Sequence, residues 1–228
     1  MRPPRVLQFI LGGSSLLVPV IAATHSYDAR TLVEYGVGFV VLVAATAGAW
    51  WMDRRSPPSP GAARTGRAIN VGLALGLLWV IEISINNFVA PPNPARDHID
   101  NAFWALIAAS ILVFSTQAAY QAHRWRDGVN AGTWSGFTSG AVACCMALCL
   151  TVFGMTAILH DPINIAEWSA RGPQTGAPSM ASYFAAETFA GALLHLTVLG
   201  IVMGALLGAL GGAVGKGIRV ARRPSPAP

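Results

Sequence analysis

Six apolar stretches dominate this chain, each near the roughly 20 residues that an α-helix needs to cross about 30 Å of hydrocarbon. The spans of a membrane β-barrel would be about half as long and would alternate in polarity, so the pattern predicts helices. Only 11% of the 228 residues are charged and 54% are hydrophobic, whereas about a quarter of a soluble domain is charged. The sequence therefore predicts an all-α, polytopic transmembrane helix bundle. The approximate spans are Val6–Ala23, Leu32–Met52, Ala68–Ala90, Ala102–Ala122, Trp134–Leu159 and Tyr183–Val214.

We expect residues 1–223 to form a single bundle and the Pro/Ser/Ala-rich residues 224–228 to form a disordered tail. The first span has an alternative interpretation, because Met1–Arg5 followed by Val6–Ala23 also has the layout of a secretory signal peptide. Ala22 and Ala23 are small enough for a cleavage site, but the apolar run is longer than the usual 7–15 or so residues of such a signal. Retention gives six spans, and cleavage would leave five in the same orientation.

The basic residues of the loops predict the orientation. With the N-terminus inside, twelve of the fifteen Lys and Arg residues fall in cytoplasmic segments and three in outer ones, as the positive-inside rule requires. Both termini are therefore predicted to be cytoplasmic. Arginine outnumbers lysine fourteen to one, which together with abundant Ala and Gly indicates a GC-rich bacterial source and hence the bacterial plasma membrane. The three outer residues are Arg30, Arg96 and Arg171.

The net charge of +5 does not indicate nucleic-acid binding, because the basic residues form short clusters between apolar runs and no stripe interleaved with aromatics. The predicted partner is the lipid bilayer, and the basic edges of the loop Asp53–Arg67 suit anionic headgroups.

The sequence contains no Walker A, HExxH or GxSxG motif. A retinal protein would need a lysine in the middle of a helix, whereas the single lysine, Lys216, lies at the edge of a span. An enzyme therefore has little support.

Glu82 is the most informative single residue, because it lies near the middle of the third predicted span. A carboxylate there costs about 2.5–3.5 kcal/mol on insertion scales and has to face protein or water. At 100° per residue, Trp79, Glu82 and Asn86 share one face of the helix. Gln117 belongs to a polar stripe on the fourth span, which either lines a cavity that meets Glu82 or, as is more common for such stripes, hydrogen-bonds to neighbouring helices. One interpretation is a proton or cation site, and the other is a protonated glutamic acid that only hydrogen-bonds between helices.

Histidines and acids gather at the predicted outer ends of the helices, where His160, Glu187 and His195 are the candidate functional residues. Such groups suit metal binding or pH sensing. His160, Glu187 and His195 lack the i, i+3 or i, i+4 spacing of a metal site, and the sequence predicts no metal and no cofactor. All cysteines lie in the fifth span without a CxxC motif, which favours packing over redox chemistry. They are Cys144, Cys145 and Cys149.

Glycine recurs at every fourth position of the sixth span, at Gly200, Gly204, Gly208 and Gly212. This spacing lets a neighbouring helix backbone approach closely, whether it belongs to the same chain, to a second copy or to another membrane protein.

The sequence supports two functional hypotheses. The chain is either a small proton- or cation-coupled transporter built around Glu82, or a non-catalytic membrane subunit or sensor that assembles through the glycine face. Against the first, the third and fourth spans have no Gly or Pro break at mid-membrane, where transporter helices are often discontinuous.

Overall fold

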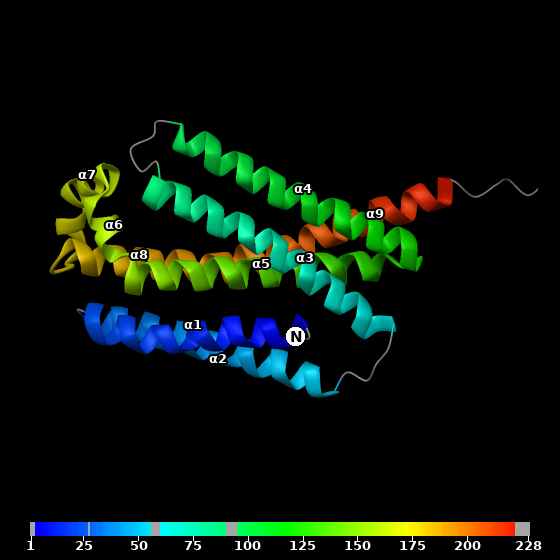
Figure 1. Cartoon of the computed structure of the whole chain (residues 1–228), viewed down its shortest axis with the longest axis horizontal. Coiled ribbons are helices and arrows are strands. Elements are labelled where there is room, and N and C mark those ends of the chain that lie inside the picture. Colours follow the sequence, from blue (N-terminus) through cyan, green and yellow to red (C-terminus); the bar gives the residue numbers. More distant parts are fainter. Residues whose placement is uncertain (1–2, 27, 56–59, 90–94, 222–228) are drawn as a thin grey trace, which may run out of the picture.

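The structure is a computed structural model that describes residues 3–26, 28–55, 60–89 and 95–221. Helices form nearly all of this part, and it contains no strand. Figure 1 shows long helices that run side by side along one axis, with a group of short helices at one end. The predicted disordered tail, residues 224–228, lies outside the described residues, as do residues 56–59 of the predicted basic loop. The elements are α1 Pro3–His25, α2 Ala29–Arg55, α3 Pro60–Ser84, η1 Ile85–Val89, α4 Arg96–Ala122, α5 Trp125–Phe153, α6 Met155–His160, α7 Pro162–Arg171, η2 Gly172–Thr175, α8 Met180–Leu194, η3 His195–Met203 and α9 Gly204–Ala221.

Among the described residues, six helices are long and apolar enough to cross a membrane, which confirms the predicted polytopic helical fold. The third of them joins α3 to the π-helix η1, and the sixth is a continuous run of α8, the π-helix η3 and α9. Their ranges are Pro4–His25, Ala29–Arg54, Gly61–Val89, Arg96–Ala122, Trp125–Phe153 and Met180–Ala221.

Several helices extend past the apolar stretches that predicted them, because small and basic residues continue a helix into polar surroundings. α3 begins at Pro60 instead of Ala68, so Glu82 lies in the last third of this longer helical span. α5 begins at Trp125, and it ends before Gly154, whose N–H donates to the Leu150 carbonyl at 2.7 Å. The predicted end at Leu159 is therefore wrong, since the chain bends at Gly154 and continues as α6.

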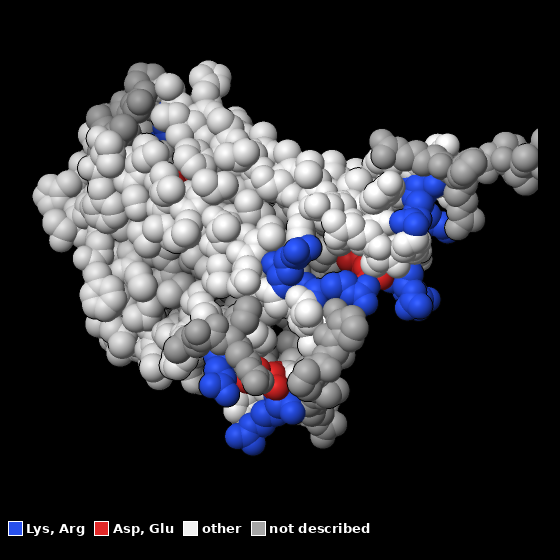
Figure 2. All heavy atoms as spheres, turned by 45° about the vertical axis from the view of Figure 1, so that its right-hand side comes forward, with Lys and Arg blue, Asp and Glu red and all other residues white. Residues whose placement is uncertain are grey.

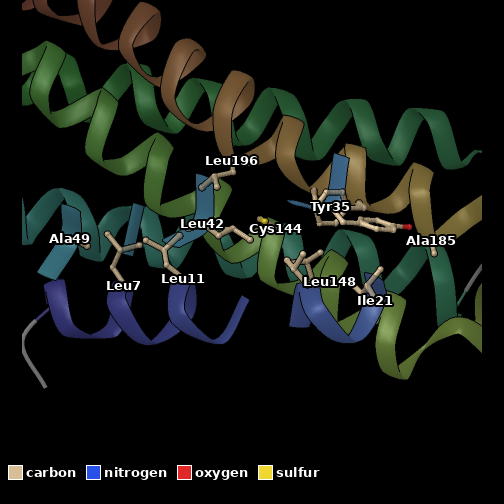
Figure 3. Packing of buried hydrophobic residues seen from close by; sticks show 14 of the residues in the cluster. Leu7, Leu11, Ile21, Tyr35, Leu42, Ala49, Cys144, Leu148, Ala185 and Leu196 are labelled. Carbon is tan, nitrogen blue, oxygen red and sulfur yellow. The ribbon is translucent and has the colours of Figure 1, made fainter. Parts of the chain in front are cut away.

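α5 occupies the centre of the bundle. It packs against α1, α3, α4, α8, η3 and α9, and it is the most buried of the six spans. Side chains of α1, α2, α5, α8 and η3 form the largest apolar core, which Figure 3 shows from close by. Cys144 points into this core between Leu42 and Leu148 and is fully buried.

Glycines allow the sixth span to lie unusually close to α5. A Cβ on Gly132 would lie 2.5 Å from the Cα of Gly208, and one on Gly136 would lie 2.8 Å from the Cα of Gly204. These neighbours are backbone atoms, which cannot move aside without separating the helices. Gly211 makes a similar approach to α4, so α9 packs between α4 and α5.

The two ends of the bundle differ in charge. We call the end where α2 ends and α3 begins the basic end, and the end where η1 ends and α4 begins the acidic end. Figure 2 shows Lys and Arg side chains gathered at the basic end, while the rest of the visible face is almost uncharged. Described basic residues at the basic end are Arg5, Arg54, Arg64, Arg67, Arg124, Arg126, Lys216 and Arg219. Acids at the other end are Asp28, Asp97, Asp100, Asp161 and Glu167.

Candidate functional site

A buried amide joins two carboxylates from different helices near the acidic end. The Asn86 Nδ2 atom lies 2.6 Å from Glu82 Oε1 and 2.6 Å from Asp100 Oδ1. An amide nitrogen carries two hydrogens, so it donates one to each carboxylate. Glu82 is 7% exposed and Asn86 is 4% exposed. The hydrogen bonds that Glu82 would make to water are therefore replaced by contacts within the protein.

The two carboxylates also interact directly, because a protonated Glu82 or Asp100 can donate a hydrogen bond to the other. Two negative charges this close repel one another strongly in a partly buried site. One bound proton or one small cation relieves the repulsion, and carboxylate oxygens are ligands that hard cations prefer. The charge state of this site therefore influences how tightly α3 and α4 are held together.

Asn86 reaches both carboxylates from the π-helix η1, which continues α3. A π-helical turn contains more residues than an α-helical turn, so the side chains that follow Ser84 are rotated relative to the α3 face. The neighbouring Asn87 points elsewhere and donates to the Ile83 carbonyl at 2.8 Å. Short π-helical segments inside helices are frequent at functional sites.

An ion pair lies beside the two carboxylates. Arg96 Nη1 is 3.1 Å from Asp161 Oδ2, and Asp161 is 1% exposed. The other oxygen of Asp161 caps α7 by accepting a hydrogen bond from the Ile163 N–H at 2.9 Å. Arg96 also acts electrostatically on Glu82. One guanidinium thus lies among three carboxylates, which leaves a net negative charge when all of them are ionised.

One helical turn from Glu82 toward the basic end, the rings of Trp79, Trp104 and His195 line a small cavity. The ring centroid of Trp79 is 4.8 Å from that of Trp104 and 5.0 Å from that of His195. The cavity has a volume of about 60 Å³, which matches about two water molecules at roughly 30 Å³ each. Ser139 also lines it, is 2% exposed, and has a hydroxyl without a hydrogen-bond partner among the described residues.

His195 presents an acceptor near this cavity. Its Nδ1 atom lies 2.8 Å from the Gly191 carbonyl oxygen. A carbonyl only accepts, so Nδ1 carries the hydrogen and Nε2 is the acceptor in the neutral ring. Ser139 and His195 therefore offer a donor and an acceptor to a small polar occupant.

Gln117 lies outside this site. It lines a pocket of about 380 Å³ between α3, α4 and α5 at the basic end, which includes neither Glu82 nor Asn86. On α3, Leu75 lies between the residues that line the pocket and those that line the small cavity, and it belongs to a buried apolar cluster. Ile107 and Ile111 of α4 belong to the same cluster and line the small cavity itself.

The structure does not gather the three predicted outer residues into one site. His195 lines the cavity described above, whose lining includes neither His160 nor Glu187. His160 is exposed and its Nδ1 atom lies 2.7 Å from the Thr156 carbonyl oxygen, and Glu187 is exposed on α8. Within the described ranges, no three His, Cys, Asp or Glu side chains lie close enough together to hold a metal ion.

The predicted glycine face of the sixth span lies against α5 of the same chain. A Cβ on Gly212 would lie 2.6 Å from the Trp125 carbonyl oxygen, and one on Gly200 would lie 3.1 Å from the Gly136 carbonyl oxygen. Gly204 and Gly208 make their close approaches to α5 between these two. This face is therefore covered within the chain.

Sequence reasoning missed the roles of Arg96, Trp104 and Ser139 in the site. It placed Asp100 and Asp161 among the acids at the outer ends of the helices but did not connect them to Glu82. One available signal was the spacing of Asp100 and Trp104, which are four residues apart and share a face of α4 with Ile107 and Ile111. No known protein-family profile, curated protein or solved structure matches this chain. Its function therefore has to be inferred from the geometry of the site.

Proposed function

We propose that this chain is a small membrane transporter coupled to a proton or a monovalent cation, with Glu82, Asn86 and Asp100 as the coupling site. The observation that carries the proposal is the single amide nitrogen of Asn86, which donates to carboxylates on two different helices. Without a bound proton or cation the two charges repel, and with one they are drawn together around the amide. Binding thereby alters the contact between α3 and α4.

Further support comes from the polar groups that continue along the contact between α3 and α4. The cavity beside Trp79 and His195 adjoins the coupling site, and the pocket that includes Gln117 opens at the basic end. Apolar side chains of α3, among them Leu75, lie between the two. Apolar side chains between two polar regions would keep a binding site from opening to both sides of the membrane at once, as alternating access requires. The π-helices η1 and η3 supply the irregular backbone that the sequence did not indicate.

The proposal includes an orientation in which the basic end is cytoplasmic, because the basic loops obey the positive-inside rule. In a bacterial plasma membrane the coupling site would then lie toward the outer surface. A proton or cation moving down its inward gradient would reach Glu82 and Asp100 before it reached the apolar barrier. Both termini would be cytoplasmic in this arrangement.

Ion flux into vesicles tests the proposal. The purified chain would be placed in vesicles that hold a pH-sensitive dye, with an imposed proton, sodium or potassium gradient and a mixture of small carboxylates and phosphate esters outside. We expect the wild-type chain to dissipate at least one gradient, and Glu82→Gln to abolish that flux. Glu187→Gln removes an exposed carboxylate of α8 and should leave the flux unchanged. Flux that persists in Glu82→Gln would contradict the coupling role.

A non-catalytic membrane subunit or sensor is the second candidate. Its predicted docking surface was the glycine face of the sixth span, and that face packs against α5 within the chain. A partner would therefore have to bind elsewhere, for example on the exposed apolar surface of α2 around Val33, Val37 and Val40. That surface also suits lipid, so it does not favour a protein partner over the bilayer.

A further inference from the structure

The pocket at the basic end is formed where α3 crosses α5. Figure 1 shows α3 crossing at an angle, so that its first turns lie on one side of α5 and the last turns of α4 lie on the other. The space between them over α5 has a volume of about 380 Å³. Pockets that bind small organic molecules usually measure about 300–1,000 Å³. The pocket is therefore large enough for an organic ligand, not only for an inorganic ion.

The charges at the mouth of the pocket favour an anion. Arg64 Nη1 forms a salt bridge with Asp127 Oδ1 at 2.7 Å, so one guanidinium is already offset by a carboxylate. Arg67 also lines the pocket, is exposed, and has no ion pair within the described part of the chain. With two guanidinium groups and one carboxylate, the lining has a net positive charge. Figure 2 shows basic side chains surrounding acidic ones at this end of the molecule.

Uncharged hydrogen-bonding groups stand beside these charges. The side-chain amides of Gln117, Gln121 and Asn130 line the same pocket. An amide offers both donors and an acceptor, so these three can satisfy phosphate or carboxylate oxygens as well as neighbouring hydroxyl groups. All three residues are exposed, which leaves their amides available to a ligand.

The deeper wall of the pocket is apolar. Phe114 and Trp134 line it two helical turns away from the charged groups, together with alanines of α3, α4 and α5. A ligand that fills the pocket therefore has its charge at the membrane edge and its apolar part toward the interior of the bundle. An interhelical pocket with basic residues on the cytoplasmic side is a recurring binding site for anionic lipid headgroups.

From these contacts we infer that the pocket binds an amphiphilic anion, with a phosphate or carboxylate group at Arg67 and an apolar part against Phe114 and Trp134. The ligand is either the headgroup region of an anionic phospholipid or a soluble organic anion. In the second case it would be the substrate of the proposed transporter, and that reading alone rests on the proposed function. Binding itself does not involve Glu82 or Asp100.

Binding of octyl phosphate to the chain in phosphatidylcholine nanodiscs tests this inference by calorimetry. We expect saturable binding of octyl phosphate and none of octyltrimethylammonium, which has the same chain length and the opposite charge. Arg67→Gln should weaken binding about tenfold or more, because it removes a charged hydrogen-bond donor. Arg126→Gln is a matched control, since Arg126 is exposed at the start of α5 and does not line the pocket. Equal binding of the two amphiphiles, or undiminished binding by Arg67→Gln, would overturn the inference.

Two further measurements are needed. The first distinguishes the two sources of the ligand, and the second distinguishes this inference from the proposed transport. If octyl phosphate loses its binding when phosphatidylglycerol replaces part of the phosphatidylcholine, the natural ligand is an anionic lipid, and if binding persists it is a soluble anion. Glu82→Gln should bind octyl phosphate like the wild-type chain. A chain that binds octyl phosphate but transports nothing would contradict the proposed transport and leave the pocket assignment intact.

Discussion

Glu82 and Asp100 lie on different helices, yet their carboxylates accept hydrogen bonds from one nitrogen atom, Nδ2 of Asn86. This relationship depends on the side-chain positions set by η1 and on the packing of α4 beside α3. Either carboxylate alone would be an ordinary polar residue at the end of a membrane helix. Together they form a site whose stability depends on what is bound between them.

The first prediction concerns the bridging amide. Asn86→Leu removes the donor of both hydrogen bonds and leaves two neighbouring carboxylates without it. Hydrogen bonds to charged groups contribute about 1.5–3 kcal/mol each, so we expect the free energy of unfolding to fall by about 2–4 kcal/mol in a denaturant titration in detergent. Asn87→Leu is the control, because Asn87 donates only to the Ile83 carbonyl of its own helix, and it should cost about 1 kcal/mol. Equal losses of unfolding free energy in the two variants would show that the two hydrogen bonds of Asn86 contribute no more than the single bond of Asn87.

A second prediction concerns the ion pair between Arg96 and Asp161. Arg96→Met leaves the buried Asp161 carboxylate without its cation, and losing one partner of a buried pair costs about 3–5 kcal/mol. Since the Arg96 side chain is 24% exposed, we expect the free energy of unfolding to fall by a smaller amount, about 2–3 kcal/mol. Hydrogen exchange should show reduced protection in α7, which Asp161 caps. Arg30→Met breaks an exposed pair with Glu34 and should cost at most about 0.5 kcal/mol. Unchanged protection of α7 in Arg96→Met would contradict the predicted role of the pair.

A third prediction tests the contact between α5 and the sixth span. Gly132→Ala places a methyl group against the backbone of Gly208, so the helices must separate, and we expect a loss of about 2 kcal/mol or more. Gly191→Ala is the matched change on α8, where a Cβ meets no atom within 4 Å. That variant should be neutral or up to about 1 kcal/mol more stable, because alanine favours a helix. Thermal unfolding in detergent compares the two, and a Gly132→Ala chain as stable as Gly191→Ala would rule out close packing at this point.

The helical fold could be predicted because it follows from one physical requirement. Each apolar stretch must satisfy its backbone hydrogen bonds internally within the bilayer, and a helix does so without help from its neighbours. The boundaries were less predictable, since helix formation continues where hydropathy ends, as in α3 from Pro60 to Ala68. The partner of the glycine face could not be predicted either, because Gly204 and Gly208 suit any helix backbone that comes close.

Only the local half of the candidate site could be predicted. Glu82 and Asn86 are four residues apart in one span, so helix periodicity already predicts that they are neighbours, whereas the π-helical turn that carries Asn86 was not predicted. Asp100 joins them because α4 packs beside α3, and Arg96 of the same helix pairs with Asp161 at the start of α7, neither of which a local pattern encodes. Gln117 was expected near Glu82 because both are polar and intramembrane, but the crossing of α3 over α5 places Gln117 in a separate pocket.

The last prediction concerns the pH dependence of the connection between α1 and α2. Asp28 precedes α2, and its Oδ1 atom accepts a hydrogen bond from the Thr31 N–H at 2.7 Å and another from the Thr31 hydroxyl. These bonds, the side-chain bond first, lower the pKa of Asp28 below its ordinary value of 3.8 because they favour the charged form. A carboxyl whose pKa is lower in the folded chain stabilises the fold when it is ionised.

The stabilisation by Asp28 is therefore complete above about pH 5 and is lost as the pH falls through the lowered pKa of the folded chain. Asp28→Asn keeps a capping oxygen but cannot be ionised, so its melting temperature should lie below that of the wild-type chain by a constant amount from about pH 5 to pH 8. The difference should shrink below pH 3.8, the ordinary pKa of the group. Thr31→Val removes the largest cause of the shift and should move this loss to higher pH. A wild-type advantage that instead grows on acidification would mean that the pKa of Asp28 is raised on folding, contrary to the hydrogen bonds that it accepts.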